Sequence, residues 1–359
     1  MPKTFILLWK SDSIGMDTFN IDTKNRLHDI LRDMKKKVLV IGDLILDRYV
    51  ETIPTRLARE APIPISRIIN EHSCAGGAGN LATNITSLGG DALVAGVIGN
   101  DYEGEILLNI FTRHKIDTTC ILKIDRETSL HTRYYVDKSL HLRIDKDVTK
   151  DLDRTNTEKL FDNIKSIIKD DIDCICISDY DKGCITPRLL RYIIMLANDK
   201  GIPVYGQPMI RHYLDFIGCT LVKSNIKEAS TATGISILNE SSLHNLGINL
   251  LTRLSAKYII LTTGKKGLTT FEENNIINIP SFIASESFRK VIGVRDAMTA
   301  MLSLALLAGA DIVEASLLSN MVAATLTPSI TTAVIEKERL KSYIDRFDKK
   351  MITKVPLHR

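Results

Sequence analysis

Short runs of apolar residues alternate along this chain with longer segments in which apolar residues recur every three or four positions. The run over 38–41, Val-Leu-Val-Ile, predicts a buried strand that ends at Gly42-Asp43. Similar runs predict further buried strands over 92–97, 174–178, 203–206, 220–223 and 258–262. The helical spacing predicts helices over 79–88, 102–113, 151–168, 187–198, 225–233, 241–254 and 297–307. Because continuous apolar strands alternate with helices, we expect an α/β fold with a doubly wound, mostly parallel sheet and helices on both of its faces.

Two stretches, 48–72 and 127–145, have a different pattern. Apolar and polar residues alternate there over short runs, at 63–68, 131–136 and 140–144. This alternation predicts antiparallel, half-exposed strands, which we expect to form a small β-sheet lid on the α/β core. The sequence predicts one domain over 37–345, an N-terminal extension over 1–36 with a helix at 24–34, and a C-terminal tail over 346–359.

The composition narrows the class of protein. The 359 residues are 44% hydrophobic and 25% charged, as in an ordinary globular protein, and the net charge of +4 is small for this length. There is no dense Lys/Arg stripe with interleaved aromatic residues, so nucleic acid is not expected as a partner. The longest apolar segment, 298–310, is shorter than a membrane span, so no membrane association is expected. The six cysteines form no CxxC pair, which favours a reducing, cytoplasmic compartment.

The most informative stretch is 291–296, Val-Ile-Gly-Val-Arg-Asp, which leads directly into the long apolar segment. A helix that begins there offers free backbone N–H groups and the positive end of its dipole to an anion. Asp296 at this junction could face both a phosphate and a hydroxyl, which is the arrangement that phosphoryl transfer needs. The alternative is that Asp296 is an N-cap residue, and these six residues alone favour the cap.

Polar residues also follow other predicted strands and could gather at one edge of the sheet. Asp43 and Asp47 come after the first strand, where carboxylates could bind sugar hydroxyls or only cap and solvate a loop. The stretch 76–80, Gly-Gly-Ala-Gly-Asn, opens a helix and is either a close approach to a ligand or a tight turn. Asn225 and Glu228 share one helical face and could hold Mg²⁺ through water, although an isolated pair of this spacing is usually structural.

Taken in order, these stretches resemble the ribokinase-like family of sugar kinases over about 37–335. The specific matches are 42–49, 56–64, 76–84, 178–183, 225–228 and 293–296. Within the family, Arg-x-x-x-Glu-Ala-Pro-x-Pro at 56–64 is similar to the branch that phosphorylates D-glycero-β-D-manno-heptose 7-phosphate in ADP-heptose and lipopolysaccharide synthesis. The resemblance implies a doubly wound α/β core with a β lid, ATP as the phosphoryl donor, Mg²⁺, and a homodimer joined through the lid.

The resemblance also implies roles for individual residues. Asp296 would be the general base, and the turn Gly293-Val294-Arg295 would be the anion hole for the transferred phosphoryl group. The substrate would be bound by Asp47, Arg56, Glu60, Gly76, Gly77, Asn80, Arg133, Arg143 and Lys182. The nucleotide would be bound by Asn225, Glu228, Thr263, Gly264, Gly267 and Asn320, with Asn225 and Glu228 also holding Mg²⁺ through water.

Two stretches depart from the family pattern. The turn Asp-x-Thr-Gly-Ala-Gly-Asp is here 290–296, with Lys290, Ile292 and Arg295 in place of the first Asp, the Thr and the second Gly. The Asp-Pro-Lys that follows a core strand in the family is here Gln207-Pro208-Met209. Arg295 would be strained if its position required a positive φ, or it could serve as a substitute anion contact.

Two hypotheses therefore stand. The first is an ATP- and Mg²⁺-dependent kinase that acts on the anomeric hydroxyl of a heptose 7-phosphate or a close relative. The second is a catalytically weak or inactive homologue that binds a sugar phosphate or a nucleotide as a regulatory module. The retained Asp296, Asn225 and Glu228 favour the first, and the altered turn and the altered Asp-Pro-Lys favour the second.

Overall fold

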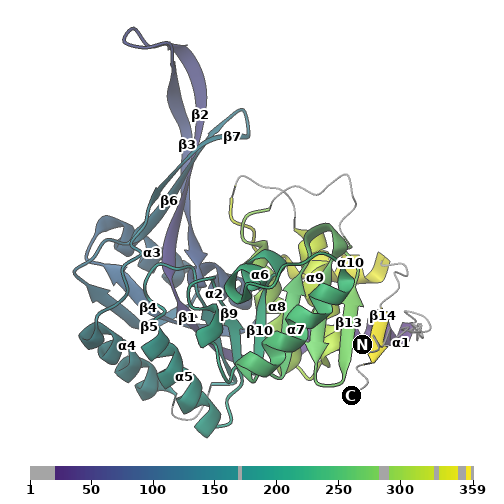
Figure 1. The fold of residues 1–359 in the computed structure, drawn as a ribbon. Coiled ribbons are helices and arrows are strands. Elements are labelled where there is room, and N and C mark those ends of the chain that lie inside the picture. Colours follow the sequence, from purple (N-terminus) through teal and green to yellow (C-terminus); the bar gives the residue numbers. More distant parts are fainter. Residues whose placement is uncertain (1–20, 169–171, 283–290, 327–330, 347–352, 357–359) are drawn as a thin grey trace, which may run out of the picture.

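The computed structural model describes residues 21–346 and 353–356, apart from 169–171, 283–290 and 327–330. Its centre is a ten-stranded sheet with the order β14-β13-β12-β11-β10-β9-β8-β1-β4-β5 (Figure 1). Neighbouring strands are parallel from β11 to β5, and β12, β13 and β14 extend the sheet with antiparallel pairing. The strands are β1 (Lys37–Gly42), β4 (Asp91–Gly99), β5 (Asp117–Ile124), β8 (Cys174–Ser178), β9 (Val204–Gln207), β10 (Leu221–Asn225), β11 (Tyr258–Thr262), β12 (Leu268–Glu272), β13 (Asn275–Ile279) and β14 (Thr353–Pro356).

Helices cover both faces of this sheet and divide the hydrophobic core into two. Val38 and Val40 of β1 face the core shared with α1, α2, α3, α8, α9 and α10. Leu39 and Ile41 face the core shared with α4, α5, α6 and α7, as the two-residue period of a strand requires. The helices are α1 (Ile21–Arg32), α2 (Ala78–Ser87), α3 (Tyr102–Arg113), α4 (Arg154–Ile167), α5 (Pro187–Asp199), α6 (Ile226–Thr233), α7 (Glu240–Leu254), α8 (Val294–Leu307), α9 (Ile312–Thr325) and α10 (Lys337–Arg346). The doubly wound α/β class is confirmed.

A second sheet, with the strand order β3-β2-β6-β7, projects from the core as the expected lid (Figure 1). Its strands are β2 (Leu44–Leu57), β3 (Pro64–Gly77), β6 (Ser129–Val136) and β7 (Ser139–Lys146). β2 pairs antiparallel with β3 but parallel with β6, so the expectation of a wholly antiparallel lid is wrong. The pairing is parallel because β2 and β6 are not joined by a hairpin; the chain passes through the core between them.

The two ends of the described chain add to the same domain. α1 lies within the segment predicted as an extension, and its Leu27, Ile30 and Leu31 are fully buried in the core that contains β1. Residues 1–20 of that segment lie outside the described residues. Thr353–Pro356, within the segment predicted as a tail, form β14 and pair with β13. Among the described residues, the helices lack the length and apolar character that crossing a membrane requires.

Candidate active site

The N-terminus of α8 begins at a glycine in the left-handed conformation. Gly293 is the N-cap residue, with φ 88°, and no side chain caps the helix. A Cβ at Gly293 would lie 2.7 Å from Nδ2 of Asn80 and 2.8 Å from Cγ2 of Thr332, so a larger residue does not fit. The interpretation of Asp296 as an N-cap is therefore wrong. An uncapped helix end can bind an anion, as the predicted anion hole requires.

Arg295 lies in the first turn of α8 and has no positive φ. The backbone strain that a positive φ would impose on a side chain at this position therefore does not arise. Ile292, which replaces the threonine of the family turn, accepts a backbone hydrogen bond from Ala333 at 2.9 Å. Lys290, the first altered position of the turn, lies outside the described residues.

Asp296 is almost completely buried, and three neutral hydrogen-bond donors contact its carboxylate. Asn80 Nδ2 donates to Oδ2 at 2.8 Å, and Gln207 Nε2 donates to Oδ1 at 2.8 Å. The hydroxyl of Tyr180 lies 2.8 Å from Oδ1 and 2.9 Å from Oδ2. Burial raises the pKa of Asp296, and the hydrogen bonds from Asn80, Gln207 and Tyr180 counteract part of that rise. The carboxylate is thus fixed in orientation, with a pKa displaced towards the range of a general base.

Asp47 is a second buried carboxylate, located where the lid joins the core. Arg133 Nη1 donates to its Oδ1 at 2.6 Å, and Thr332 Oγ1 donates to its Oδ2 at 3.2 Å. Burial alone would raise the pKa of Asp47, but contacts with His131 and Arg133 hold that pKa below its usual value. A Cβ at Gly76 would lie 2.6 Å from Oδ2 of Asp47, which explains why glycine is needed there.

The structure connects Asp47 to Asp296 and so brings several predicted residues together. Thr332 contacts Asp47 and lies against Gly293, and Asn80 lies between Gly293 and Asp296. One continuous cluster around Asp296 therefore contains the predicted residues Asp47, Gly76, Asn80, Arg133 and Gly293. Gly77, with φ 56°, is the N-cap residue of the helix that carries Asn80.

Of the other predicted substrate residues, Arg56, Glu60 and Arg143 lie farther out along the lid, whereas Lys182 lies in the loop after β8. Lys182 Nζ is paired with Asp147 at 2.6 Å, and Arg143 Nε is paired with Asp145 at 2.7 Å on β7. Arg143 and Arg133 are direct cross-strand partners. The exposed Arg56 pairs with Ile65 at the closed end of the β2–β3 hairpin, and Glu60 lies in the turn that joins the two strands; neither is brought into the cluster around Asp296. Figure 1 shows this hairpin projecting away from the core. The stretch 56–64, which is the most specific part of the resemblance, thus lies far from the Asp296 carboxylate of the same chain.

Asp43 is structural, contrary to the expectation that it binds sugar hydroxyls. Its carboxylate accepts three backbone N–H bonds, from Tyr180 at 2.7 Å, Lys182 at 3.2 Å and Cys184 at 2.9 Å. Burial, together with the neighbouring Asp179, raises the pKa of Asp43 to about 6. Asp43 therefore holds the loop after β8 in place, and that loop carries Tyr180.

A pocket of about 200 Å³ lies on the other side of Arg295 from this cluster. It is lined by Lys223, Ser224, Asn225, Thr262, Gly264, Gly267, Ser281, Val294, Arg295, Met298, Asn320 and Ala323. Four of the predicted nucleotide residues, Asn225, Gly264, Gly267 and Asn320, therefore share one pocket. Thr263 lies beside it, where its hydroxyl donates to the carbonyl of Gly267 at 3.0 Å.

Asn225 and Glu228, the expected Mg²⁺ residues, form the N-terminal capping box of α6. Asn225 Oδ1 accepts the N–H of Glu228 at 2.8 Å, and Glu228 Oε2 accepts the N–H of Asn225 at 3.1 Å. The remaining oxygen, Oε1 of Glu228, accepts Nη1 of Arg295 at 3.2 Å. The pair therefore has a structural role in the cap of α6, and both side chains are engaged within the protein.

Lys223, Tyr180 and Gln207 are site residues that sequence reasoning did not identify. Lys223 is buried on β10, and its Nζ donates to the carbonyl of Arg295 at 3.0 Å. Burial and the adjacent Arg295 lower the pKa of Lys223 to about 7. The sequence contained a signal for Lys223, because a lysine inside a buried strand needs a hydrogen-bonding or charged partner.

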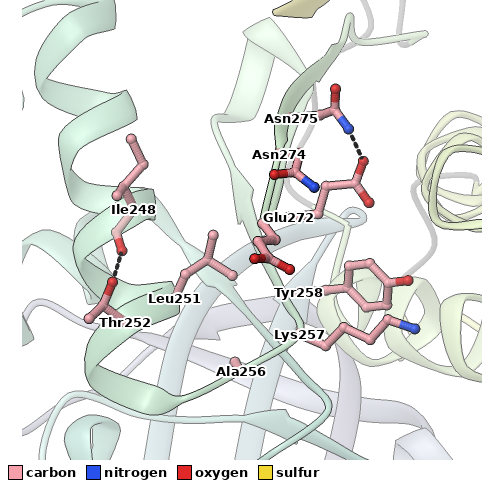
Figure 2. A pocket seen from close by; sticks show the side chains of 10 residues that line it. Ile248, Leu251, Thr252, Ala256, Lys257, Tyr258, Glu272, Asn274 and Asn275 are labelled. Atoms are coloured by element: carbon pink, nitrogen blue, oxygen red, sulfur yellow. Dashed lines mark hydrogen bonds between the residues drawn. The ribbon is translucent and has the colours of Figure 1, made fainter. Parts of the chain in front are cut away.

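A larger hollow, of about 730 Å³, lies at the opposite edge of the sheet (Figure 2). It is bounded by the end of α7, by Tyr258 at the start of β11, and by Glu272 and Asn275 at the β12–β13 turn. Asn275 Nδ2 donates to Glu272 Oε1 at 2.7 Å within the wall that this turn forms. Because ligands of open α/β sheets bind beyond the carboxyl ends of the strands, the smaller pocket beside α8 is the better candidate.

Comparison with known sequences agrees with this geometry. Residues 35–336 match the pfkB family of carbohydrate kinases. The chain is 31% identical over 315 residues to a Helicobacter hepaticus protein named bifunctional protein HldE, and 33% identical over 299 residues to its Geobacter sulfurreducens namesake. These alignments cover 88% and 83% of this chain but only 65% and 60% of the two relatives.

Solved structures share the fold at low sequence identity. Phosphofructokinase-2 from Escherichia coli, in complex with substrates and products, has a TM-score of 0.70 at 19% identity and covers 87% of this chain and 100% of its own. Arabidopsis thaliana ribokinase, complexed with ribose and ATP, has a TM-score of 0.67 at 15% identity, with 88% and 100% coverage. With the family match extending over most of the described domain, this chain belongs to the pfkB family of carbohydrate kinases.

Proposed function

We propose that this chain transfers the γ-phosphoryl group of ATP to a sugar phosphate, D-glycero-β-D-manno-heptose 7-phosphate or a close relative, at the anomeric hydroxyl. The observation that carries the proposal is Asp296. Its buried, oriented carboxylate stands at an uncapped helix N-terminus, between the Asp47 cluster and the pocket that contains Asn225, Gly264 and Asn320. A base, an anion-binding helix end and two flanking sites are what a kinase needs.

In this reaction Asp296 accepts the proton of the sugar hydroxyl as the hydroxyl oxygen attacks the γ-phosphorus. The new O–P bond forms while the bond between the γ-phosphorus and the bridging oxygen breaks, and ADP leaves with that electron pair. Asn80, Gln207 and Tyr180 hold the carboxylate in one orientation throughout. Backbone N–H groups at the start of α8 stabilise the charge that develops on the transferred group.

The substrate assignment rests on the lid and on the relatives. The stretch 56–64 resembles heptose 7-phosphate kinases, and the relatives described above share the name HldE. Asp47, Gly76, Gly77 and Asn80 would bind the sugar hydroxyls. Arg133, Arg143 and Lys182 would meet the sugar phosphate, after exchanging at least one of their present carboxylate partners for it.

The donor assignment rests on the pocket beside α8. Members of this family use ATP and a divalent metal. We assign the nucleotide to Asn225, Gly264, Gly267 and Asn320, with Thr263 supporting the loop. The side chains of Asn225 and Glu228 are engaged with each other's backbone and with Arg295, so charge stabilisation falls to the protein's own groups.

The test is ADP release by the purified chain with ATP and heptose 7-phosphate, compared with ribose 5-phosphate and fructose 6-phosphate. We expect turnover to be largest with the heptose phosphate and to fall by a factor of about 10² to 10⁴ in Asp296→Asn. Asp162→Asn, a matched change on the exposed face of α4, is the control and should leave turnover unchanged. Absence of sugar-dependent ADP release with all three sugars would refute the kinase.

A second candidate function is a binding module without turnover, and Arg295 is the observation that favours it. Its guanidinium joins the helix end to Glu228, where the family pattern has a glycine. In that case the chain would bind the sugar phosphate or ATP in calorimetry but release no ADP. Binding of either compound without turnover would support the module over the kinase.

We further propose that the chain is a homodimer joined through its lid and resides in the cytoplasm. Leu140, Leu142 and Ile144 on β7 are 51–52% exposed, and Ile68 and Ile69 on β3 are 56% and 54% exposed. Such a concentration of exposed apolar side chains on one small sheet is typical of an interface. The six cysteines are all free thiols, which agrees with a reducing compartment.

A further inference from the structure

The two stretches that depart from the family pattern meet in the structure. Nη2 of Arg295 donates to the carbonyl oxygens of Gln207 at 3.1 Å and Pro208 at 2.8 Å. Nη1 of the same guanidinium lies 3.1 Å from Sδ of Met209, the residue that stands in place of the family's lysine. A cation is thus missing from the loop after β9, and a cation has been gained on α8 that reaches that same loop.

The oxygens expected to serve Mg²⁺ are already used by N–H donors. Both carboxylate oxygens of Glu228 accept hydrogen bonds, one from Asn225 and one from Arg295, and Oδ1 of Asn225 accepts the N–H of Glu228. Magnesium needs free oxygen lone pairs, on the protein or on waters that the protein orients, and a site of net negative charge. Arg295 neutralises Glu228, so this donor set does not fit a divalent cation.

The guanidinium of Arg295 is also fixed from further directions. Its Cζ lies 5.3 Å from the centre of the Tyr180 ring, in a cation–π contact. Lys223 donates to the carbonyl oxygen of Arg295 at 3.0 Å, which places a second basic side chain beside that residue. A divalent cation at Glu228 would have to displace the guanidinium of Arg295 from that carboxylate, against electrostatic repulsion from the guanidinium.

We propose that Arg295 supplies the positive charge that a metal at Glu228 and the family's lysine would supply, so that nucleotide binds here without a divalent cation. The inference rests on the proposed function, because it concerns the nucleotide side of that site. The planar guanidinium suits phosphate oxygens, which it can contact through two N–H groups at once. In the chain, Arg295 is therefore a binding residue for nucleotide phosphate and excludes metal from Glu228.

Calorimetric titration of ATP into the full-length protein tests this directly, in buffer with MgCl₂ and in buffer with EDTA. For the wild type we expect the two dissociation constants to agree within about threefold. The double variant Met209→Lys/Arg295→Gly restores the family residues and frees Glu228. It should bind ATP at least about tenfold more tightly with Mg²⁺ than with EDTA. Arg295→Gly alone, which lacks both cations, should bind ATP most weakly in EDTA.

A tenfold or greater loss of wild-type ATP affinity in EDTA would overturn the inference, whatever the variants do. Because wild-type protein gives this answer, a variant that fails to fold does not obscure it, and circular dichroism identifies such a variant. If sugar phosphorylation occurs but nucleotide binding needs Mg²⁺, this inference is wrong and the kinase stands. If ATP binds in neither buffer, the nucleotide site itself is wrong, and the inference is refuted together with the kinase.

Discussion

Replacing Lys223 by methionine should change how the stability of the protein depends on pH. Lys223 is 2% exposed, and burial and the adjacent Arg295 lower its pKa from 10.5 to about 7. Methionine has a similar length and no charge, so Lys223→Met removes the titrating group while filling most of its volume. Comparison with this variant therefore isolates the pH-dependent contribution of one buried amine to the free energy of unfolding.

The sign follows from the protons bound in each state. Between pH 7 and 10.5 the unfolded chain carries the proton on Lys223 and the folded chain does not, so the free energy of unfolding rises with pH. Below pH 7 both states are protonated, and the full cost of burying the charge is present. One pH unit within the window corresponds to about 1.4 kcal/mol, and Lys223 in the folded chain is half protonated at pH 7, so from pH 7 to pH 9 its contribution rises by roughly 2 kcal/mol.

Urea unfolding of the wild type and the variant at pH 6, 7, 8 and 9 measures this contribution as the difference between two curves. The wild type should gain roughly 2 kcal/mol over the variant between pH 7 and pH 9, with much less relative change from pH 6 to pH 7. Lys227→Met, a matched change at an exposed position of α6, should follow the wild-type curve. A constant difference between wild type and Lys223→Met across this range would refute the reasoning about a buried lysine beside Arg295.

Further predictions concern stability and assembly. Arg133→Met should lower the free energy of unfolding by about 3–5 kcal/mol, because it leaves the buried carboxylate of Asp47 without the guanidinium that pairs with it. Urea unfolding measures this loss, and adding Asp47→Asn to the same variant should recover most of it. No recovery in the double variant would contradict the ion-pair account. Gly293→Ala should lower the free energy of unfolding more than Gly309→Ala does in the same assay. At Gly309 only the backbone strain of a positive φ is expected, which costs roughly 1 kcal/mol. Both glycines have φ above 80°, but only at Gly293 would a Cβ meet neighbours, so equal losses would speak against the tight fit at α8. Leu142→Lys should convert a dimer into a monomer in sedimentation velocity, and an unchanged sedimentation coefficient would argue against the lid interface.

The strands of the parallel sheet could be predicted because both of their faces are buried. The run 174–178 is apolar without interruption until Ser178, and β8 has those bounds. β12 and β13 could not be predicted, since polar residues occur among their buried positions. Thr269 and Asn278 are cross-strand partners, and the hydroxyl of Thr269 donates to Oδ1 of Asn278 at 2.7 Å. Only the assembled sheet reveals this pairing.

The sequence pattern also does not predict helix α9, because polar residues occur at its buried positions too. It is buried on nearly all sides and lacks the polar face that marks a surface helix, although Ser319 and Asn320 interrupt its apolar residues. Ser319 donates to the carbonyl of Met298, and Asn320 donates to that of Pro280. These partners lie in distant parts of the chain, so the sequence pattern near α9 does not show how its polar groups are satisfied.

The position of the candidate site was predictable, but its internal contacts were not. Parallel strands bring their carboxyl ends to one edge, which is why Asp43, after β1, and Asn225, at the end of β10, could be expected near one another. Asn80 follows a lid strand and Asp296 follows no strand of the parallel part, so their places come from the resemblance alone. The pairing of Arg295 with Glu228 and with 207–209 depends on contacts between elements 67 to 88 residues apart. From the sequence, Arg295 was only an isolated departure from a glycine pattern. In the fold it becomes the residue that joins the two altered stretches.

The central claim is that Asp296 activates a sugar hydroxyl for attack on ATP. Phosphorus-31 NMR of the chain with ATP and heptose 7-phosphate tests it most directly, because it detects the transferred group itself. We expect the ATP signals to decline, ADP to appear, and a new anomeric phosphate resonance to grow in equal amount. Asp296→Asn should show none of these changes over the same time. ATP loss without a new sugar phosphate, or transfer that persists in the variant, would contradict the account.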